Sequence, residues 1–460
     1  MYQQNLPIYD GRYDAKNPLE TTAPPIQLFH PVFGHFLDDL SNDLPVPPQI
    51  ANATVGYMQA SSAIYDNEAT RRVTLEPHLG RILGNGMGTV VNADGTSPDG
   101  ALSITLTKGV CDTIALLLKE DKNNLGDGGC DPSIQAGLSM SRFWAQGQVD
   151  KCEFSLLSPA LMPLFYQHSV VRNNTCCPTF LLATAGPWFT ILGAVFTDKW
   201  IVQRLTDFIW VGLDASINEP HCDRVARILY SLRRSVNKLY DYYAGLNVIT
   251  TDTEDIDPRF FPSICAYRDE DGGIVDFKYI KPLEFDSTCV TFHAKTTSAN
   301  PKDVVVKFVH RYGEEAHRLL ARESLAPQLF YHGKIGVLEG DPSYGHLRMV
   351  VMDYIDGDTF DQAKQIPPTF VDQIRRALDI LHSQGYVFGD LRGPNIMITK
   401  NGEVKLIDFD WAGVHMKSRY PLLISHNLMW PAGVEGLSIM KTEHDDNMLA
   451  QLLPVIRSKK

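Results

Sequence analysis

The chain has 460 residues, a formal net charge of −12, 44% hydrophobic residues and 21% charged residues. Single hydrophobic cores stop growing at about 250 to 300 residues, so this length predicts two domains. The composition is that of an ordinary globular protein. Binding nucleic acid through bulk charge requires clustered Lys and Arg, so the acidic balance argues against that function for the chain as a whole. Binding through a local basic groove stays an alternative.

The start of the chain, MYQQNLPIYDGRYDAKNP, has no basic stretch followed by an apolar one and does not match a secretory signal. We therefore expect an intracellular location, either cytoplasmic or nuclear. The eight cysteines include no C-x-x-C pair, which favours buried thiols over a zinc site or a disulfide framework.

The first half is expected to form an extended arm followed by alternating strands and helices. Residues 1–50 are rich in proline and polar residues, which predicts the arm. A buried strand is expected at 113–118, followed by a glycine-rich turn at 126–129. Asp-Pro-Ser at 131–133 predicts the start of a helix that runs toward Trp144, because proline is tolerated in a first helical turn.

Two longer patterns follow in the chain. Residues 179–196 are about long enough to cross a bilayer, but Gly186 and Pro187 lie in their middle. Together with the β-branched and aromatic content, this favours two buried strands joined by a turn. Between Glu219 and Leu246, apolar residues recur every three or four positions with Arg and Lys between them, which indicates an amphipathic helix.

These patterns divide the chain into four parts and predict an α+β protein with two domains. The arm over 1–50 precedes an α/β domain with a mixed sheet over 51–246. A polar and acidic segment that ends in proline predicts a linker over 247–264. The second domain is expected over 265–460.

The first domain carries the P-D…(D/E)-x-K pattern of restriction-endonuclease-like nucleases. Pro98-Asp99 is followed, after twenty residues, by Glu120-Asp121-Lys122. Asp99 and Glu120, at the ends of adjacent strands, would chelate a divalent metal, and Lys122 would orient water or phosphate from the same strand face. Gln135 could support the site. Both halves of the pattern are also common in ordinary turns, so plain surface charges are the alternative. Nucleic acid is expected as a partner only through this domain.

The second domain carries, in chain order, the groups that phosphoryl transfer needs: a cation on the phosphates, ligands for a metal and a carboxylate beside the attacking hydroxyl. Lys307 lies among β-branched residues in VVVKF, from where it could reach phosphate. A helix is predicted from YGEEAHRLLA. We expect Glu315 to be the ion-pair partner of Lys307, with Glu314 as the alternative, because the sequence does not determine the register.

Two further runs resemble the catalytic loop and the metal-binding loop of protein kinases. They are GDLRGPN and, after the turn at 400–402, the strand VKLIDFD. This resemblance implies that Asp390 orients or deprotonates the acceptor hydroxyl and that Arg392 lies near the transferred phosphate. It also implies that Asn395 and Asp408 hold Mg²⁺.

The strand MVVMDYI, about forty residues before the catalytic loop, has the position and composition of the hinge that receives adenine in protein kinases. Asp353, Tyr354 and Ile355 are therefore expected to offer backbone groups to ATP.

The second domain departs from the usual kinase pattern at several positions. Phe388-Gly389 replaces the His-Arg before the catalytic aspartate, so the arginine that senses a phosphorylated activation loop is missing. Asp410 replaces the glycine of D-F-G, no G-x-G-x-x-G precedes Lys307, and no A-P-E follows Asp408. We therefore expect a bilobal kinase-like fold with a shortened C-terminal lobe, and either an unusual acceptor or a pseudokinase.

The runs KFVHRYGEEAHRLLA, ESLAPQLFYHG, GDLRGPNIMI and LIDFDWAG resemble the fungal-type protein kinase-like proteins of mushroom-forming basidiomycetes. The resemblance covers most of residues 265–450 and implies ATP binding and Ser/Thr kinase activity, although Phe388 departs from the histidine common in that family. Fungal relatives also carry E-x-K-N and G-G-x-D-P-S-x-Q segments, matched here at 120–123 and 128–135, which favours the nuclease-like fold.

Three functions stay open from the sequence. The first is ATP- and Mg²⁺-dependent transfer of the γ-phosphate to a protein hydroxyl, with no involvement of a membrane. The second is a pseudokinase that binds nucleotide without turnover. The third is a nuclease-like effector with a regulatory kinase half, in which Lys122→Ala would abolish DNA cleavage. We favour the first because every residue that touches metal or phosphate is present.

Overall fold

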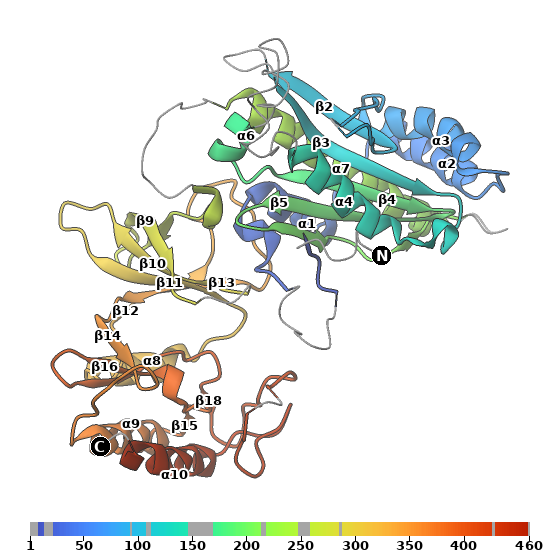
Figure 1. The fold of residues 1–460 in the computed structure, drawn as a ribbon. Coiled ribbons are helices and arrows are strands. Elements are labelled where there is room, and N and C mark those ends of the chain that lie inside the picture. Colours follow the sequence, from blue (N-terminus) through green and yellow to red (C-terminus); the bar gives the residue numbers. More distant parts are fainter. Residues whose placement is uncertain are drawn as a thin grey trace. The chain divides into compact units, whose positions relative to one another are not determined.

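A computed structural model describes residues 8–12, 22–92, 94–106, 112–145, 169–212, 218–246, 258–284, 288–425 and 428–458. The chain divides into two compact units, which are coloured along the chain in Figure 1. Unit 1 comprises Met1–Ile264, Asp286–Cys289 and Glu339–Gly345, and unit 2 comprises Cys265–Phe285, Val290–Leu338 and His346–Lys460. Residues 247–257 of the expected linker lie outside the described residues.

A mixed sheet forms the centre of unit 1. Its strands lie in the order β1-β6-β5-β4-β3-β2, and β7 pairs with β5. The strands are β1 (Ile8–Tyr9), β2 (Gly100–Leu106), β3 (Asp112–Lys122), β4 (Thr179–Ala185), β5 (Trp188–Phe196), β6 (Trp200–Arg204) and β7 (Ile209–Trp210). β3 and β4 run parallel, whereas β2 with β3 and β4 with β5 are antiparallel. A parallel pair needs a crossover connection, and α4 (Pro132–Ala145) and α6 (Ser169–Asn174) lie in that connection.

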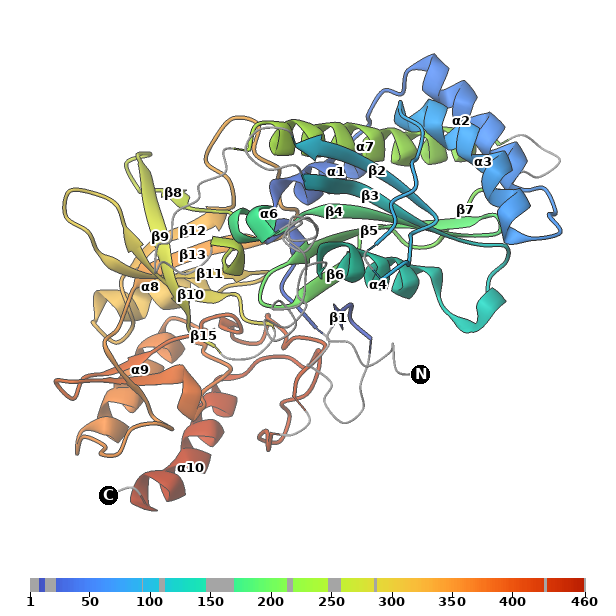
Figure 2. The same cartoon turned by 45° about the horizontal axis from the view of Figure 1, so that its top comes forward.

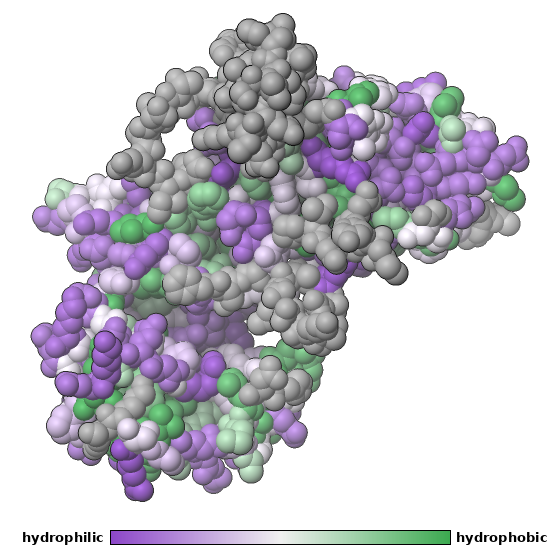
Figure 3. Space-filling model, viewed as in Figure 1, coloured by the Kyte–Doolittle hydropathy of each residue, from purple (hydrophilic) through white to green (hydrophobic). Residues whose placement is uncertain are grey.

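Helices cover both faces of this sheet. α7 (Glu219–Ala244) packs along one face together with α1 (Pro31–Ser41), α2 (Pro48–Ser61) and α3 (Glu68–Leu83), and α4 packs against β3 and β4 on the other face, as Figure 2 shows. The outer surface over α2 and α3 is mostly hydrophilic in Figure 3. The buried apolar residues of α3 recur at helical spacing on its inner face, at Leu75, Leu79 and Ile82.

Residues 26–50 differ from the extended arm that composition predicts for 1–50. They form α1 and the first residues of α2, and Phe33 of α1 packs edge-on against Phe180 of β4 with ring centroids 5.2 Å apart. The prolines begin helices: Pro31 follows the N-cap His30, and Pro48 opens α2. Proline at a first helical position loses no hydrogen bond, which explains why a proline-rich composition is compatible with helices here.

The apolar segment 179–196 forms the neighbouring strands β4 and β5, joined at Gly186 and Pro187. Every residue of β4 is buried. None of the helices in the described part of the chain is both long and apolar enough to cross a membrane. The prediction of two buried strands is confirmed.

Unit 2 begins with an antiparallel sheet in the order β12-β13-β11-β10-β9-β8. Its elements are β8 (Ala266–Arg268), β9 (Ile274–Pro282), β10 (Thr291–Thr296), β11 (Asp303–Val309), α8 (Glu314–Arg322), β12 (Leu329–Lys334) and β13 (Arg348–Asp353). Buried Ala316 and Leu320 are four residues apart and therefore share the inner face of α8.

The rest of unit 2 is a second, mainly helical lobe with short strands. It contains β14 (Gly357–Thr359), α9 (Phe370–Ser383), β15 (Tyr386–Val387), β16 (Ile396–Thr399), β17 (Val404–Leu406), β18 (Gly413–Val414) and α10 (Thr442–Ser458). α9 buries Ile374, Leu378 and Leu381 on one face. The two lobes confirm the predicted mixed α+β class, and the loops between β15 and β18 lie where the catalytic motifs are expected.

Candidate active site

The site in unit 2 begins with a buried lysine on the central part of its sheet. Lys307 lies on β11 between β10 and β13, and only 6% of the residue is exposed. Its Nζ lies 2.8 Å from Oδ1 of Asp408 and 2.9 Å from Oδ2 of Asp410. Burial by itself would lower the pKa of Lys307, but the two carboxylates together raise it above its ordinary value. The lysine is therefore a cation held at the metal-binding loop.

The expected ion pair between Lys307 and Glu315 is not formed among the described residues. Glu315 is exposed in the first turn of α8. The alternative partner, Glu314, accepts hydrogen bonds from Arg318 Nε at 2.9 Å and is paired with His332 Nδ1 at 2.8 Å. Glu314 and Glu315 therefore have other surroundings than Lys307, and the helix register that decides this could not be derived from the sequence.

The catalytic loop brings the three residues predicted for it together. Asn395 Nδ2 donates to Oδ2 of Asp390 at 2.8 Å and to the Asp390 carbonyl at 2.9 Å. Arg392 donates through Nε to one oxygen of Asp390 and through Nη2 to the other, at 2.7 Å. Burial raises the pKa of Asp390 above its ordinary value, although Arg392 opposes that shift. A carboxylate with a raised pKa is better suited to accept a proton.

The metal-binding loop is joined to the catalytic loop through the backbone. Ile407 N–H donates to the Asn395 carbonyl at 3.0 Å, and β15 pairs with β18. Asp408 has a φ of 65°, in the left-handed region that non-glycine residues rarely adopt. Burial favours a neutral Asp408, but the ion pair with Lys307 holds the pKa of this carboxyl below its ordinary value. Asp408 is thus ionised and held in a specific backbone conformation.

A buried carboxylate that the sequence reasoning missed supports the catalytic loop from α10. Asp445, with none of its surface exposed, accepts the backbone N–H groups of Phe388 and Gly389, each at 2.8 Å. It is also 3.0 Å from the ring Nε2 of His382. In KTEHDDNML this acidic residue lies among other polar residues, and its partners are more than fifty residues away, so the sequence does not distinguish it from a surface charge.

Aromatic rings connect α8 with both loops. The ring of His317 stacks on Phe409, and Phe409 meets Phe388 edge-on with centroids 5.3 Å apart. Phe388, which replaces the usual histidine before the catalytic aspartate, is fully buried in this contact. The replacement is therefore accommodated by packing rather than by a hydrogen bond from its side chain.

These contacts join a strand lysine, an Asp–Asn catalytic loop and an aspartate of a metal-binding loop. Residues 288–429 match the protein kinase domain. Unit 2 therefore contains a kinase domain, and the sequence prediction of one in the C-terminal half is confirmed.

Relatives of the kinase domain are Ser/Thr protein kinases. The serine/threonine-protein kinase OXI1 of Arabidopsis thaliana is 39% identical over 85 residues, which cover 16% of this chain and 19% of that protein. A protein of Encephalitozoon cuniculi, named "Probable cAMP-dependent protein kinase catalytic subunit", is 23% identical over 173 residues, 34% of this chain and 53% of that protein. The chain thus spans about a fifth and about half of the lengths of these two relatives.

Three residues were predicted to form the adenine-binding hinge. Two of them donate their backbone N–H groups to other backbone groups. Asp353 N–H donates to the Gln328 carbonyl at 2.9 Å, and Tyr354 N–H donates to the Asp303 carbonyl at 3.2 Å. Tyr354 also stacks on His293. Among the described backbone hydrogen bonds, Ile355 N–H has no acceptor.

The oxygen atoms predicted to hold Mg²⁺ fit that ion by their chemistry. Asn395 uses its amide nitrogen on Asp390, which leaves its amide oxygen for a ligand, and Asp408 supplies an ionised carboxylate. Mg²⁺ prefers such hard oxygen donors, binds through one or two protein groups and keeps several waters. Bound there with ATP, it would neutralise phosphate charge during transfer.

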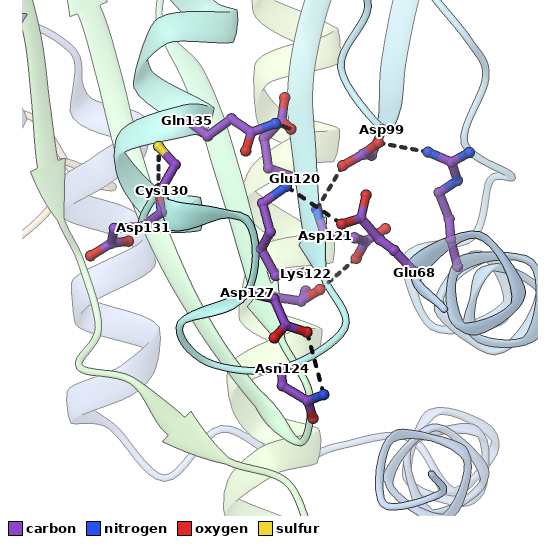
Figure 4. Close-up of polar contacts among 12 residues, drawn as sticks. Glu68, Asp99, Glu120, Asp121, Lys122, Asn124, Asp127, Cys130, Asp131 and Gln135 are labelled. Atoms are coloured by element: carbon purple, nitrogen blue, oxygen red, sulfur yellow. Dashed lines mark hydrogen bonds and ion pairs between the residues drawn. The ribbon is translucent and has the colours of Figure 1, made fainter. Parts of the chain in front are cut away.

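A second group of polar residues lies in unit 1, at one end of β2 and β3. Gly100 pairs with Lys119 across these strands, so Asp99 lies beside Glu120, as Figure 4 shows. Oδ2 of Asp99 accepts the backbone N–H of Asp121 at 2.9 Å. The structure thus brings together the two carboxylates of the nuclease-like pattern.

Glu120 in this group is almost completely buried and is held by α4. Its carboxyl oxygens accept hydrogen bonds from Gln135 Nε2 at 2.6 Å and Ser139 Oγ at 2.5 Å. Burial, followed by the neighbouring Asp99, raises the pKa of Glu120 to about 8. Gln135 therefore has the supporting position predicted for it, and Glu120 retains a proton at neutral pH.

The remaining residues of the pattern have other partners. Lys122 Nζ lies 3.5 Å from Glu68, and Asp99 is paired with Arg72 at 2.6 Å. Asp121 points to the opposite face of β3, where it is paired with buried Lys119 at 2.6 Å. Across the described ranges, no three His, Cys, Asp or Glu side chains are close enough together to hold a metal ion.

Proposed function

We propose that the protein is an ATP- and Mg²⁺-dependent protein kinase that transfers the γ-phosphate of ATP to Ser or Thr hydroxyls. The kinase domain and the Ser/Thr kinase relatives support the reaction class. In this proposal Lys307 binds the α- and β-phosphates, and Asn395 and Asp408 hold Mg²⁺. Asp390 accepts or orients the hydroxyl proton, and Arg392 lies beside the transferred phosphate.

The observation that carries the proposal is the hydrogen bond between Asn395 and Asp390, at 2.8 Å. It holds the expected metal ligand and the expected base in one arrangement before substrate binds. Positioning of this kind is the main contribution of a protein to phosphoryl transfer, because the transition state is loose and needs little covalent chemistry from side chains. The resemblance to fungal-type kinases agrees with this function.

Phosphate transfer provides the direct test. Purified full-length protein is incubated with γ-labelled ATP and Mg²⁺, alone and with generic protein substrates, and Asp408→Ala is treated in parallel. We expect label on Ser or Thr of the wild type and none with Asp408→Ala. The absence of label from the wild type, together with Mg²⁺-dependent nucleotide binding that Asp408→Ala abolishes, would identify a pseudokinase instead.

We propose as a second candidate function that unit 1 cleaves nucleic acid with a divalent metal. The adjacency of Asp99 and Glu120, with a raised pKa at Glu120, supports it, because two close carboxyls share a proton when no cation is bound. Incubation of DNA and RNA with Mg²⁺ or Mn²⁺ tests this function. Cleavage should be lost in Lys122→Ala, and equal cleavage by both proteins would indicate a contaminating nuclease.

A further inference from the structure

The buried cation of the kinase domain has two carboxylate partners in one short loop. Lys307 Nζ contacts Asp408 at 2.8 Å and Asp410 at 2.9 Å. A buried ammonium group that loses its partners is strongly destabilised, so its position depends on a nearby negative charge. The question is which carboxylate holds the lysine when ATP and Mg²⁺ are bound.

Asp408 cannot serve as the sole partner during the proposed reaction, on which this inference rests. Once it is a ligand of Mg²⁺, its charge is shared with the ion and its attraction for Lys307 weakens. Protein kinases commonly solve this with a second carboxylate, a glutamate on the helix after the lysine strand. That helix is α8 in this protein.

The face of α8 that meets the metal-binding loop has no room for such a glutamate. Gly313, its N-cap, donates its N–H to the Phe409 carbonyl at 2.9 Å. A Cβ atom at Gly313 would lie 2.5 Å from Ala412 Cβ and 2.7 Å from the Ala412 carbonyl oxygen. Four residues later, on the same face, His317 stacks on Phe409. Any side chain at Gly313 therefore collides with the loop it would have to serve.

We propose that Asp410 is the positioning residue for Lys307 and replaces the helix glutamate of other kinases. Asp410 occupies the place of the glycine in D-F-G, so the carboxylate has moved from the helix to the loop. Its Oδ2 contacts the lysine, and 29% of its side chain is exposed. Because Lys307 and both partners belong to one strand and one loop, the pair forms without any movement of α8.

The test compares Asp410→Asn, which keeps the shape of the side chain and removes its charge, with Asp379→Asn, which changes an exposed carboxylate on α9. Two measurements are made on the full-length protein. One is the phosphate-transfer rate against Mg²⁺ concentration. The other is labelling of Lys307 by an acyl-phosphate derivative of ATP, in which the lysine amine forms an amide with the acyl carbon and ATP leaves.

We expect Asp410→Asn to lower kcat and the labelling of Lys307 at least tenfold, without changing the Mg²⁺ concentration that gives half-maximal rate. We expect Asp379→Asn to behave as wild type. Glu314→Gln and Glu315→Gln should lower neither quantity by more than twofold. If Asp410→Asn is not folded by circular dichroism, Asp410→Gly replaces it, because glycine is the residue of the common motif.

Three results would overturn the proposal. A severalfold rise in the Mg²⁺ requirement of Asp410→Asn would make Asp410 a metal ligand. Unchanged labelling in Asp410→Asn would show that Asp408 is sufficient, and a larger loss in Glu314→Gln or Glu315→Gln would return the role to α8. A wild type that transfers no phosphate contradicts the proposed function, whereas the labelling comparison still decides the partner of Lys307.

Discussion

The ring of His317 lies parallel to the ring of Phe409, with centroids 4.5 Å apart and an interplanar angle of 6°. His317 is fully buried, with its ring nitrogens 2.7 Å from the Tyr312 hydroxyl and 2.8 Å from the Pro327 carbonyl. The carbonyl can only accept, so Nε2 carries the proton and Nδ1 accepts from Tyr312. A neutral histidine is therefore built into the contact between α8 and the metal-binding loop.

This histidine predicts that the kinase domain loses stability on acidification. Burial lowers the pKa of His317 from 6.5 to about 4. Below the unfolded-state pKa of 6.5 the unfolded chain takes up a proton that the folded chain refuses, so stability falls as the pH falls from 6.5 toward 4. The loss at pH 5 is about 2 kcal/mol. Denaturant unfolding at pH 7.5 and pH 5 measures it.

In His317→Leu, the difference in stability between the two pH values should shrink by that amount. In His346→Gln, which changes an exposed histidine of the same unit, it should stay at the wild-type value. An identical pH dependence in wild type and His317→Leu would contradict the assignment.

Asp445→Asn is expected to impair both stability and catalysis. The amide keeps one acceptor oxygen but turns an N–H₂ group toward the N–H groups of Phe388 or Gly389, so a buried charged acceptor is lost. Hydrogen bonds to charged groups contribute about 1.5–3 kcal/mol each, and we expect a loss of about 3 kcal/mol. Asp446→Asn, one residue further along α10 and exposed, is the matched control. Equal unfolding free energies of the two variants would exclude the support role.

Gly313→Ala should destabilise the kinase domain by about 1–3 kcal/mol, because overpacking forces backbone or side-chain shifts. The added methyl group would meet both Cβ and the backbone of Ala412, neither of which is the end of a flexible chain. Gly86→Ala is the comparison, since nothing lies within 4 Å of a Cβ atom there. Thermal unfolding measures the stability of both variants. A Gly313→Ala protein as stable as wild type would mean that the loop at Ala412 moves aside at little cost in free energy.

Asp390→Asn should lower kcat by about 10² to 10⁴, the range expected for a general base, while leaving nucleotide affinity close to that of wild type. The reason is that Asp390 contacts Arg392 and Asn395 but not Lys307. Steady-state kinetics together with nucleotide binding measure the two effects. A loss of nucleotide binding as large as the loss of kcat would place Asp390 in the ATP site instead.

Metal binding in unit 1 should raise its stability. With Mn²⁺ at 100 times its dissociation constant, the expected stabilisation is about 2.7 kcal/mol. Glu120→Gln should remove this gain, whereas Asp66→Asn, a change at an exposed residue near α3, should retain it. Thermal unfolding with and without Mn²⁺, followed by EDTA, gives the comparison. A gain that persists in Glu120→Gln would exclude Asp99 and Glu120 as the ligands.

The parts of the kinase site that lie in short, continuous motifs were predictable from the sequence. Asp390, Arg392 and Asn395 occupy one loop, so their closeness in space follows from their spacing in the sequence. The partner of Lys307 was not predictable, because it depends on the rotation of α8 about its axis. Asp445 was missed for a related reason: its contacts join residues far apart in the sequence, and only the packing of α10 against the loop reveals them.

The helix α1 and the start of α2 in unit 1 were predicted wrongly, as an extended arm, because the prediction used composition alone. The composition showed that this region is rich in proline, but it did not show that the prolines lie at the first positions of helices whose apolar residues, such as Phe33, are buried. Proline breaks a helix when it lies in the interior and is favoured at the first helical position. A proline-rich sequence is therefore compatible with an extended arm and also with helices that begin at the prolines. In the nuclease-like pattern, by contrast, the sequence predicted that Asp99 and Glu120 lie at the ends of adjacent strands, and the pairing of β2 with β3 brings them together.

The carboxylate that supports the catalytic loop is synthesised long after the loop. Phe388 and Gly389 precede Asp445 by 57 and 56 residues. While the ribosome is still translating the intervening residues, the backbone N–H groups of Phe388 and Gly389 cannot yet donate hydrogen bonds to Asp445. A growing chain thus contains the catalytic-loop residues before it contains the carboxylate that accepts the N–H groups of Phe388 and Gly389. This part of the fold is therefore complete only after α10 has emerged and packed.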